Sequence, residues 1–351
     1  MSAELRQAWP LPSNPRPIVI LGGGGIVRDA HLPAYRKAGL PVAGVFDLDR
    51  SRAQALAAEW SIPRVYDSLE AAVAEPGAVF DIAAPPTAHA ALLWALPEGA
   101  AALVQKPMGL DLEAATRIRD VCRARRLTAA VNFQLRFSPM MLAVADALAQ
   151  GRLGRLLDVE VHLNLVTPWH LFPHLKPNPR VEIVSHSIHY LDLIRSLAGD
   201  PLSVLARTYG HPASDLAQTR TTAILDYGTD LRVALSINHH HDFGRKFQDA
   251  SFRFEGDRGA ALVKLGLLLN YPEGEPDELW LAPLGGPWGQ VPLAGRWFPD
   301  AFIGPMANLQ RFAAGEDAVL HTSVEDAWRT MALVEACYRS NATPGVPVPQ
   351  G

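Results

Sequence analysis

The sequence predicts an α/β protein of two domains, the first built on a parallel sheet and the second on a large, mostly antiparallel open sheet. Its 351 residues exceed the length of one typical domain. As far as about residue 133, short apolar runs alternate with helix-length segments, which is typical of a parallel sheet covered on both faces. Farther along, apolar residues alternate within segments joined by turn residues, which favours antiparallel strands.

The N-terminal domain is expected over residues 17–132, after an extension formed by residues 1–16. Apolar runs predict its strands, in order, at residues 18–21, 42–46, 64–66, 79–83, 101–104 and 127–133. Helices are predicted between them at residues 31–38, 50–60, 68–74, 88–96 and 112–125. Ser68 is the expected N-cap of its helix, because a seryl oxygen can accept from a backbone amide of the first turn.

The C-terminal domain is expected over residues 133–341, with a proline-rich tail at 342–351. Helices are predicted at residues 139–150, 183–197 and 324–339. Strands are predicted at residues 156–166, 204–209, 221–227, 231–238, 250–255 and 260–265. The stretch 272–305 is rich in Pro, Gly and Trp, and we expect it to form loops over the sheet.

Composition narrows the class of protein. The net charge is −4 and no basic run marks a nucleic-acid-binding face. No window is apolar for the ~18 residues that a membrane span requires, and residues 1–17 lack the apolar core of a secretory signal. The two cysteines, Cys122 and Cys337, form no disulfide framework. We therefore expect a cytoplasmic protein that binds neither nucleic acid nor membrane.

A glycine-rich bend follows the first predicted strand. Gly22, Gly24 and Val27 occupy the three special positions of G-x-G-x-x-G/A, between a strand and a helix. The first glycine permits the tight turn, and the second lets the backbone approach a pyrophosphate at the helix N-terminus. Val27 is larger than the small residue usual at the third position, so either the helix sits slightly off or Gly25 accommodates it. The motif predicts a Rossmann domain that binds a dinucleotide.

An acidic residue follows the second predicted strand. Asp47 lies 23 residues beyond Gly24, near the spacing of ~20 at which a carboxylate binds the ribose 2′-hydroxyl of NAD. A carboxylate there repels the 2′-phosphate of NADP, so NAD is the favoured cofactor. Arg50 and Arg52 lie just beyond and would instead attract that phosphate, which leaves NADP as the alternative.

Further motifs complete a family pattern. They are His31-Leu32-Pro33-Ala34, Ala84-Pro85-Pro86-Thr87-Ala88-His89, Gln105-Lys106-Pro107-Met108, Arg136-Phe137-Ser138-Pro139 and His189-Tyr190-Leu191-Asp192-Leu193. In this order and spacing, the chain resembles the Gfo/Idh/MocA family of oxidoreductases over nearly its whole length. The resemblance implies a Rossmann domain followed by an α+β domain. It also implies oxidation or reduction of a CH–OH group of a sugar, polyol or related compound, and homodimers or homotetramers formed through the second sheet.

The resemblance implies that Lys106 lies at the nicotinamide and the substrate hydroxyl. An ammonium there can hydrogen-bond the oxygen that becomes a carbonyl and stabilise its developing charge. The family usually has glutamate before this lysine, where the present chain has Gln105. A neighbouring carboxylate is therefore not expected to orient Lys106.

The same resemblance implies that His189 accepts or donates the proton. The family usually has an aspartate four residues earlier, where this chain has Ser185. Ser185 and His189 share a helix face, and His186 lies one turn before His189. Ser185 or His186 would take over part of the missing role at the substrate.

Other residues are assigned to the cofactor and the substrate. Gly25, Ile26, Pro85, Thr87 and His89 are expected to contact the cofactor, with Gly22, Gly24, Asp47 and Lys106. Trp169 lies in an aromatic loop that offers an apolar face and polar edges to a sugar ring. Arg136 would either pair with an acidic substrate or join the two domains.

The run Asn238-His239-His240-His241-Asp242 raises a second hypothesis for the histidines. On a strand, His239 and His241 would face one way, and with His186 and His189 they could hold a metal ion. No fixed spacing supports this set, so the expected site contains no metal and the histidines line a polyol pocket or end a strand.

The sequence thus predicts an NAD(P)-dependent oxidoreductase acting on CH–OH groups. Two alternatives remain, because the acids are absent at Gln105 and Ser185. One is a lyase, hydratase or glycoside-cleaving enzyme that uses tightly held NAD transiently, with or without a metal. The other is a non-catalytic sensor that binds the cofactor.

Overall fold

The computed structural model describes residues 4–349, and its contacts divide the chain into two compact units. The first unit combines residues up to 147 with residues 292–331, and the second combines residues 148–291 with the chain after 331. The boundary expected at residues 132/133 follows sequence order alone. The contacts instead place residues 292–331 with the N-terminal part of the chain.

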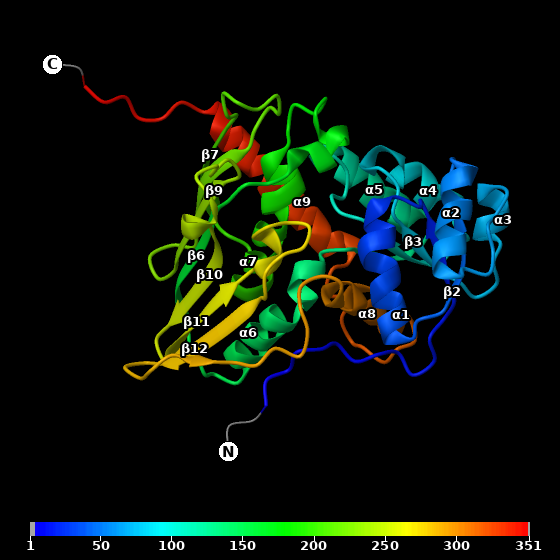
Figure 1. Cartoon of the computed structure of the whole chain (residues 1–351), viewed down its shortest axis with the longest axis horizontal. Coiled ribbons are helices and arrows are strands. Elements are labelled where there is room, and N and C mark those ends of the chain that lie inside the picture. The colour runs from blue at the N-terminus through cyan, green and yellow to red at the C-terminus, as the bar shows by residue number, and fades with distance from the viewer. Residues whose placement is uncertain (1–3, 350–351) are drawn as a thin grey trace. The chain divides into compact units, whose positions relative to one another are not determined.

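The first unit contains a five-stranded parallel sheet in the order β2-β1-β3-β4-β5. Figure 1 labels β2 and β3 of this sheet among the helices of the unit. The strands are β1 (Ile18–Leu21), β2 (Val42–Phe46), β3 (Val79–Ile82), β4 (Ala101–Val104) and β5 (Thr128–Val131). The chain builds β2 on one side of β1 and then crosses to build β3 on the other side. Ligands of such sheets bind outside the carboxyl ends of the strands at this reversal.

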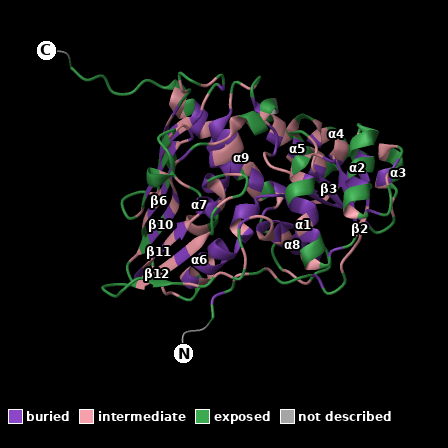
Figure 2. Cartoon of the chain, viewed as in Figure 1, coloured by how far each residue is buried: buried purple, intermediate pink, exposed green. Residues whose placement is uncertain are grey.

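Helices follow each strand of this sheet. They are α1 (Leu32–Ala38), α2 (Arg50–Trp60), α3 (Leu69–Val73), α4 (His89–Ala95), α5 (Leu112–Ala124) and α6 (Pro139–Ala149), which ends in the second unit. Asp49 caps α2, Asp111 caps α5, and Ser68 caps α3 as predicted, its hydroxyl accepting from the amide of Ala71 at 3.2 Å. Figure 2 shows buried residues along the strands and exposed ones on α2, as binary patterning requires.

The strand predicted at residues 64–66 is wrong. Val65 forms only an isolated parallel bridge to Val45. The amide of Tyr66 donates to the carbonyl of Val45 at 3.0 Å, and the ladder stops there. Three residues between two helices bring too few backbone groups to the sheet edge to extend a strand.

The second unit contains an eight-stranded sheet in the order β13-β12-β11-β10-β6-β9-β8-β7. Its strands are β6 (Leu156–Asn164), β7 (Ser203–Tyr209), β8 (Arg220–Asp226), β9 (Arg232–Asn238), β10 (Asp249–Gly256), β11 (Gly259–Lys264), β12 (Glu278–Pro283) and β13 (Gly289–Gln290). All neighbours pair antiparallel except β6 and β9. The helix α7 (Ile188–Ala198) packs on one face, where Tyr190 meets Phe252 of β10 with ring centroids 5.4 Å apart.

The prediction that residues 272–305 form only loops is wrong. This stretch contains β12, β13 and the start of α8 (Ile303–Ala313). Its prolines and glycines suggested turns, yet Leu279 is buried between half-buried neighbours and pairs with Val263 of β11. Pro305 occupies the first turn of α8, where a missing amide hydrogen costs no helical bond.

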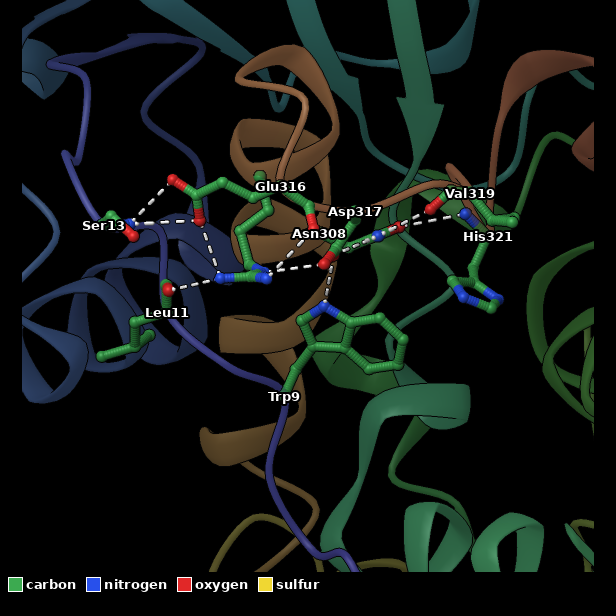
Figure 3. A network of polar contacts seen from close by, with 9 residues as sticks. Trp9, Leu11, Ser13, Asn308, Glu316, Asp317, Val319 and His321 are labelled. Atoms are coloured by element: carbon green, nitrogen blue, oxygen red, sulfur yellow. Dashed lines mark hydrogen bonds and ion pairs between the residues drawn. The ribbon is translucent and has the colours of Figure 1, made fainter.

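The N-terminal segment is held against α8 and the chain that follows it (Figure 3). The indole of Trp9 donates to Asp317 at 2.9 Å, and its ring packs edge-on against Phe137 and His321. The amide of Ser13 donates to Glu316 at 3.1 Å. These bonds make the described part of the extension an integral part of the first unit.

The long helix α9 (Val324–Ala342) matches the predicted closing helix. Cys122 and Cys337 are free and buried, as the absence of a disulfide framework predicted. Within residues 4–349, no helix combines the length and apolar character needed to span a membrane.

Candidate functional site

The glycine bend leaves the end of β1 where the strand order reverses. Gly22 has φ of +107° and approaches the end of β3 so closely that a Cβ would lie 2.9 Å from the carbonyl carbon and oxygen of Ala83. Any larger residue would be strained and would collide with backbone at this point. A Cβ on Gly24 would meet no atom within 4 Å. The first glycine therefore shapes the bend, and the second faces open space suited to an incoming ligand.

The helix after the bend begins with a wide turn. Val27–His31 form a π-helical turn that continues into α1, and Val27 is fully buried. The amides of Val27 and Arg28 both donate to the carbonyl of Gly24, at 3.0 and 3.4 Å. The bulky third position of the motif is thus accommodated within the core, where half-buried Ile26 also packs.

Asp47 lies immediately after β2 and is bonded to the glycine bend. Its Oδ2 accepts the amide of Gly23 at 2.7 Å, and its Oδ1 accepts the amide of Asp49 at 2.8 Å. Because each carboxylate oxygen can accept more than one hydrogen bond, these contacts orient the group without exhausting it. The structure therefore brings the predicted ribose-binding acid and the bend together.

The two arginines beyond Asp47 have different partners. Arg50 forms an ion pair with Asp67, and Arg52 lies 3.4 Å from the carboxylate of Asp47. Of the two, Arg52 is thus the cation that neighbours the predicted ribose-binding group.

The loop after β3 contains three predicted cofactor contacts. Pro85 and Thr87 are exposed, whereas His89 is buried at the start of α4. Burial lowers the pKa of His89 to about 4, so its ring is neutral near pH 7 and Nε2–H donates to the carbonyl of Ala84 at 2.9 Å. His89 thereby holds the loop that the glycine bend approaches.

Lys106 follows β4, which is the neighbour of β3. Burial lowers the pKa of its ammonium to about 8. The side chain of Gln105 accepts the backbone amide of Lys106 at 3.3 Å, a contact that supports the backbone. An amine with a pKa near 8 exchanges a proton readily close to neutral pH, as an acid–base group must.

Sequence reasoning missed a buried polar network beneath the bend. Asp81 of β3 is fully buried, and its Oδ2 lies 2.7 Å from Nδ1 of His31 and accepts the hydroxyl of Tyr35 at 2.8 Å. Asn132 lies 3.3 Å from the other nitrogen of His31. The feature of the sequence that could have indicated this network is the aspartate inside the apolar run of residues 79–83. The network ties the first helix to β3 and to the end of β5.

Arg136 has partners within the first unit. Its guanidinium donates to Asp326 of α9 at 2.7 Å and to the carbonyl of His321 at 3.1 Å. Only about a tenth of its side chain is exposed. These contacts connect Arg136 to α9 and to the backbone of His321, which gives it a structural role within that unit.

In the second unit, the helix expected from residue 183 starts with a π-helical turn, Ile183–Ser187, and continues as α7. His189 is buried, with 7% exposed, whereas Ser185 and His186 are half-buried. The wider turn alters which side chains share a face near its start. Ser185 and His186 therefore form the more accessible part of this segment.

His239 is the centre of a cluster in the second unit. Its Nδ1 lies 2.7 Å from the hydroxyl of Thr167, and its Nε2 lies 3.4 Å from the carboxylate of Glu182. Its ring is 4.9 Å from that of His186 and 5.2 Å from that of Trp169, measured between centroids. The structure thus brings together two predicted substrate residues, Trp169 and His186, and adds Glu182, which sequence reasoning missed.

The three consecutive histidines have different neighbours. β9 ends at Asn238, so they lie beyond the strand. His241 lies 2.9 Å from the amide nitrogen of Asn164, and His240 stacks on His211 with centroids 4.4 Å apart. The expectation that His239 and His241 face one way stays a prediction, because β9 ends before them and, of these three described residues, only His240 forms an isolated bridge, to Val166. Within the described residues, no group of three or more His, Cys, Asp and Glu side chains is arranged to hold a metal ion.

Comparison with known proteins finds a matching family model for each of two parts of the chain. Residues 16–133 match the model of an oxidoreductase family with an NAD-binding Rossmann fold, and residues 141–262 match the GFO/IDH/MocA C-terminal domain. D-apiose dehydrogenase of Paraburkholderia graminis is 26% identical over 91% of this chain and 86% of its own. Inositol 2-dehydrogenase 2 of Saccharopolyspora erythraea is 28% identical over 92% of each.

Among solved structures, levoglucosan dehydrogenase in complex with NADH and levoglucosan has the same fold. The TM-score is 0.78 at 17% identity, covering 94% of this chain and 98% of that one. The strand order, the glycine bend and the matched models agree with one another. The protein belongs to the GFO/IDH/MocA family of oxidoreductases, with an NAD-binding Rossmann domain and the family's C-terminal domain.

Proposed function

We propose that the protein is an NAD-dependent dehydrogenase that oxidises a CH–OH group of a sugar, polyol or sugar derivative, or reduces the corresponding carbonyl. The observation that carries the proposal is in the first unit. There the glycine bend lies at the strand-order reversal, and a lysine with a lowered pKa follows the strand next to β3. The names of the relatives, a D-apiose and an inositol dehydrogenase, support the substrate class.

Residues 22–26 would hold the pyrophosphate through backbone amides, and Asp47 would bind the adenosine ribose. Asp47 already orients the bend through Gly23, and a ribose hydroxyl can donate to its remaining lone pairs. Its negative charge disfavours a 2′-phosphate, so NAD is the proposed cofactor. Pro85 and Thr87, exposed after β3, and the loop that His89 supports would flank the dinucleotide.

A bound nicotinamide would supply the hydride chemistry at the carbinol carbon. Lys106 would hydrogen-bond the substrate oxygen and stabilise the charge that develops on it. His189 would accept the hydroxyl proton during oxidation and donate it during reduction. His186, Ser185 and Trp169 would contact the remainder of the substrate.

We also propose that the chain forms a homodimer or homotetramer through the outer face of its second sheet. On edge strand β7 and its neighbour β8, Leu205 and Ile224 pair directly and are 68% and 49% exposed. Farther along that sheet, Arg232 pairs with Asp158. Exposed apolar side chains beside charged pairs suit an interface between identical subunits. Light scattering would show a dimer or tetramer that Leu205→Asp converts to monomers.

The direct test of the proposed activity is a panel of polyols and sugars assayed with NAD⁺, following absorbance at 340 nm and products by NMR. The proposal expects an oxidised product and NADH in equal amounts. Product without net NADH would favour the transient-redox lyase suggested by Gln105 and Ser185. Cofactor binding without turnover of any compound would favour a sensor.

A further inference from the structure

The second unit contains a carboxylate in an unfavourable environment. Glu182 is fully buried just before the π-helical turn. Its Oε1 accepts the hydroxyl of Ser187 at 2.7 Å and faces Nε2 of His239 at 3.4 Å. Its Oε2 has no hydrogen-bond partner among the described residues. A buried carboxylate costs several kcal/mol of desolvation, so a group held this way needs a specific partner to offset the cost.

The contacts of Glu182 determine the orientation of His239. A carboxylate only accepts, so Nε2 of His239 carries the hydrogen and donates to Glu182. Nδ1 then accepts the hydroxyl of Thr167 at 2.7 Å. With both nitrogens engaged, the ring of His239 can neither flip nor change tautomer without losing a hydrogen bond.

His239 in turn supports two more accessible rings. Trp169 and His186 are half-buried, and their centroids are 5.0 Å apart with planes at 79°. Each also lies within 5.2 Å of His239. We call these three rings, Trp169, His186 and His239, the three-ring wall. Edge-to-face packing is directional, so turning the inner ring displaces the two outer ones.

We propose that Glu182 and His239 are positioning residues for the substrate: the buried carboxylate fixes His239, which holds Trp169 and His186 in the orientation that meets the substrate ring. This inference rests on the proposed function for the identity of the ligand, and on the geometry of the second unit for the positioning itself. The ligand class is a hydroxylated ring, because the wall combines an indole face with an imidazole edge.

The first experiment needs no substrate. Protein labelled with 5-fluorotryptophan is studied by ¹⁹F NMR, and the Trp169 resonance is assigned with Trp169→Phe. Glu182→Gln keeps the shape of the side chain but removes its charge. We expect it to shift or broaden the Trp169 resonance. The matched control is Glu278→Gln, a carboxylate of β12 that bonds Lys264 and Trp280, and it should leave that resonance unchanged.

The second experiment measures kcat and KM on the best compound of the polyol and sugar panel. We expect Glu182→Gln to lower kcat/KM on the order of 100-fold, since small misplacements of substrate-orienting groups cost that much. NADH affinity and melting temperature should stay close to those of the unaltered protein. His239→Gln retains a donor toward Glu182 and should recover part of the rate that His239→Phe loses.

The outcomes separate this inference from the proposed function. If the unaltered protein turns over no compound, the proposed function fails, and the Trp169 resonance alone decides the positioning role. If Glu182→Gln leaves both the resonance and kcat/KM within twofold of the original, the inference is overturned. If Glu182→Gln does not fold, Ser187→Ala, which removes one donor to Glu182, and His239→Phe provide the same two readouts.

Discussion

The candidate site residues of the two units are of different kinds. In the first unit the groups that shape the glycine bend are backbone: a left-handed Gly22, the open position at Gly24 and the amide of Gly23 bonded to Asp47. In the second unit the candidate groups are side chains, with Glu182, His239 and Trp169 drawn from three separate segments. A backbone site depends on a short local pattern, whereas a side-chain site depends on how distant segments pack. The difference decides what sequence alone can predict.

The largest effect is expected at Lys106, the side chain of the first unit that we propose acts on the substrate oxygen. Replacing Lys106 by Met removes the ammonium that would stabilise the substrate oxygen. We expect kcat to fall by roughly 100- to 10,000-fold, the usual contribution of an acid–base group. NADH binding, followed by its fluorescence, should persist. Lys246→Met, an exposed lysine of the second unit, is the control, and near-normal turnover by Lys106→Met would remove Lys106 from the mechanism.

The two glycines of the bend can be tested separately, Gly22 for the shape of the turn and Gly24 for the approach of the dinucleotide. Gly24→Ala adds a methyl group in open space, so stability should not change, yet dinucleotide affinity should fall by about tenfold or more as the phosphate is kept away. Gly22→Ala should instead lower the melting temperature, because of its φ of +107° and the contact with Ala83. Calorimetry and thermal melts distinguish the two. Equal behaviour of both variants would contradict the separate roles.

The lowered pKa of Lys106, about 8, predicts that the rates of both directions of reaction fall above that pH. Carbonyl reduction needs the protonated ammonium, so its kcat/KM should fall about tenfold per pH unit above 8. Alcohol oxidation needs the same ammonium to stabilise the charge that develops on the substrate oxygen, so its kcat/KM should also fall above pH 8. If the rate of the Lys106→Arg variant still falls near pH 8, the pH dependence belongs to another group.

A smaller effect is expected on the choice of cofactor. Asp47→Ser removes the charge that repels a 2′-phosphate and leaves Arg52 nearby. The preference for NAD over NADP should shrink by about tenfold, or roughly 1.4 kcal/mol. Kd values for NADH and NADPH check this. An unaltered protein that prefers NADPH would overturn the NAD assignment.

The smallest effect concerns the fold of the first unit alone. Trp9→Ala removes the indole bond to Asp317 and the packing on Phe137, but Trp9 is only half-buried. We expect a loss of about 1–2 kcal/mol in the free energy of unfolding, measured in denaturant. An unchanged midpoint would mean that the N-terminal segment contributes nothing to this unit's stability.

Much of the first unit could be predicted from the sequence because its signals are local. The strands β2 and β4 and the helix α2 have the predicted bounds, since apolar periodicity and turn residues fix them. The family followed from short motifs in order, and the matched models confirm it. The strand predicted at residues 64–66 is wrong because one apolar residue between polar neighbours does not indicate how many residues pair with the sheet.

The features that the sequence did not predict depend on contacts between residues that are far apart in the chain. Glu182 and His239 are 57 residues apart, so no local pattern pairs them. Asp81 and His31 are 50 residues apart in the same way. The strand β12 and the helix α8 were not predicted, because the prolines and glycines near them suggested loops. Those residues belong to the turns around β12 and to the first turn of α8. The roles predicted for His189, Arg136 and the other site residues remain predictions.

The measurement closest to the central claim is calorimetric titration of NADH into the protein and into its Gly24→Ala variant. We predict one site per chain, with affinity reduced in the variant and melting temperature unchanged. Absence of binding heat, together with no rise in melting temperature at millimolar NADH, would contradict it.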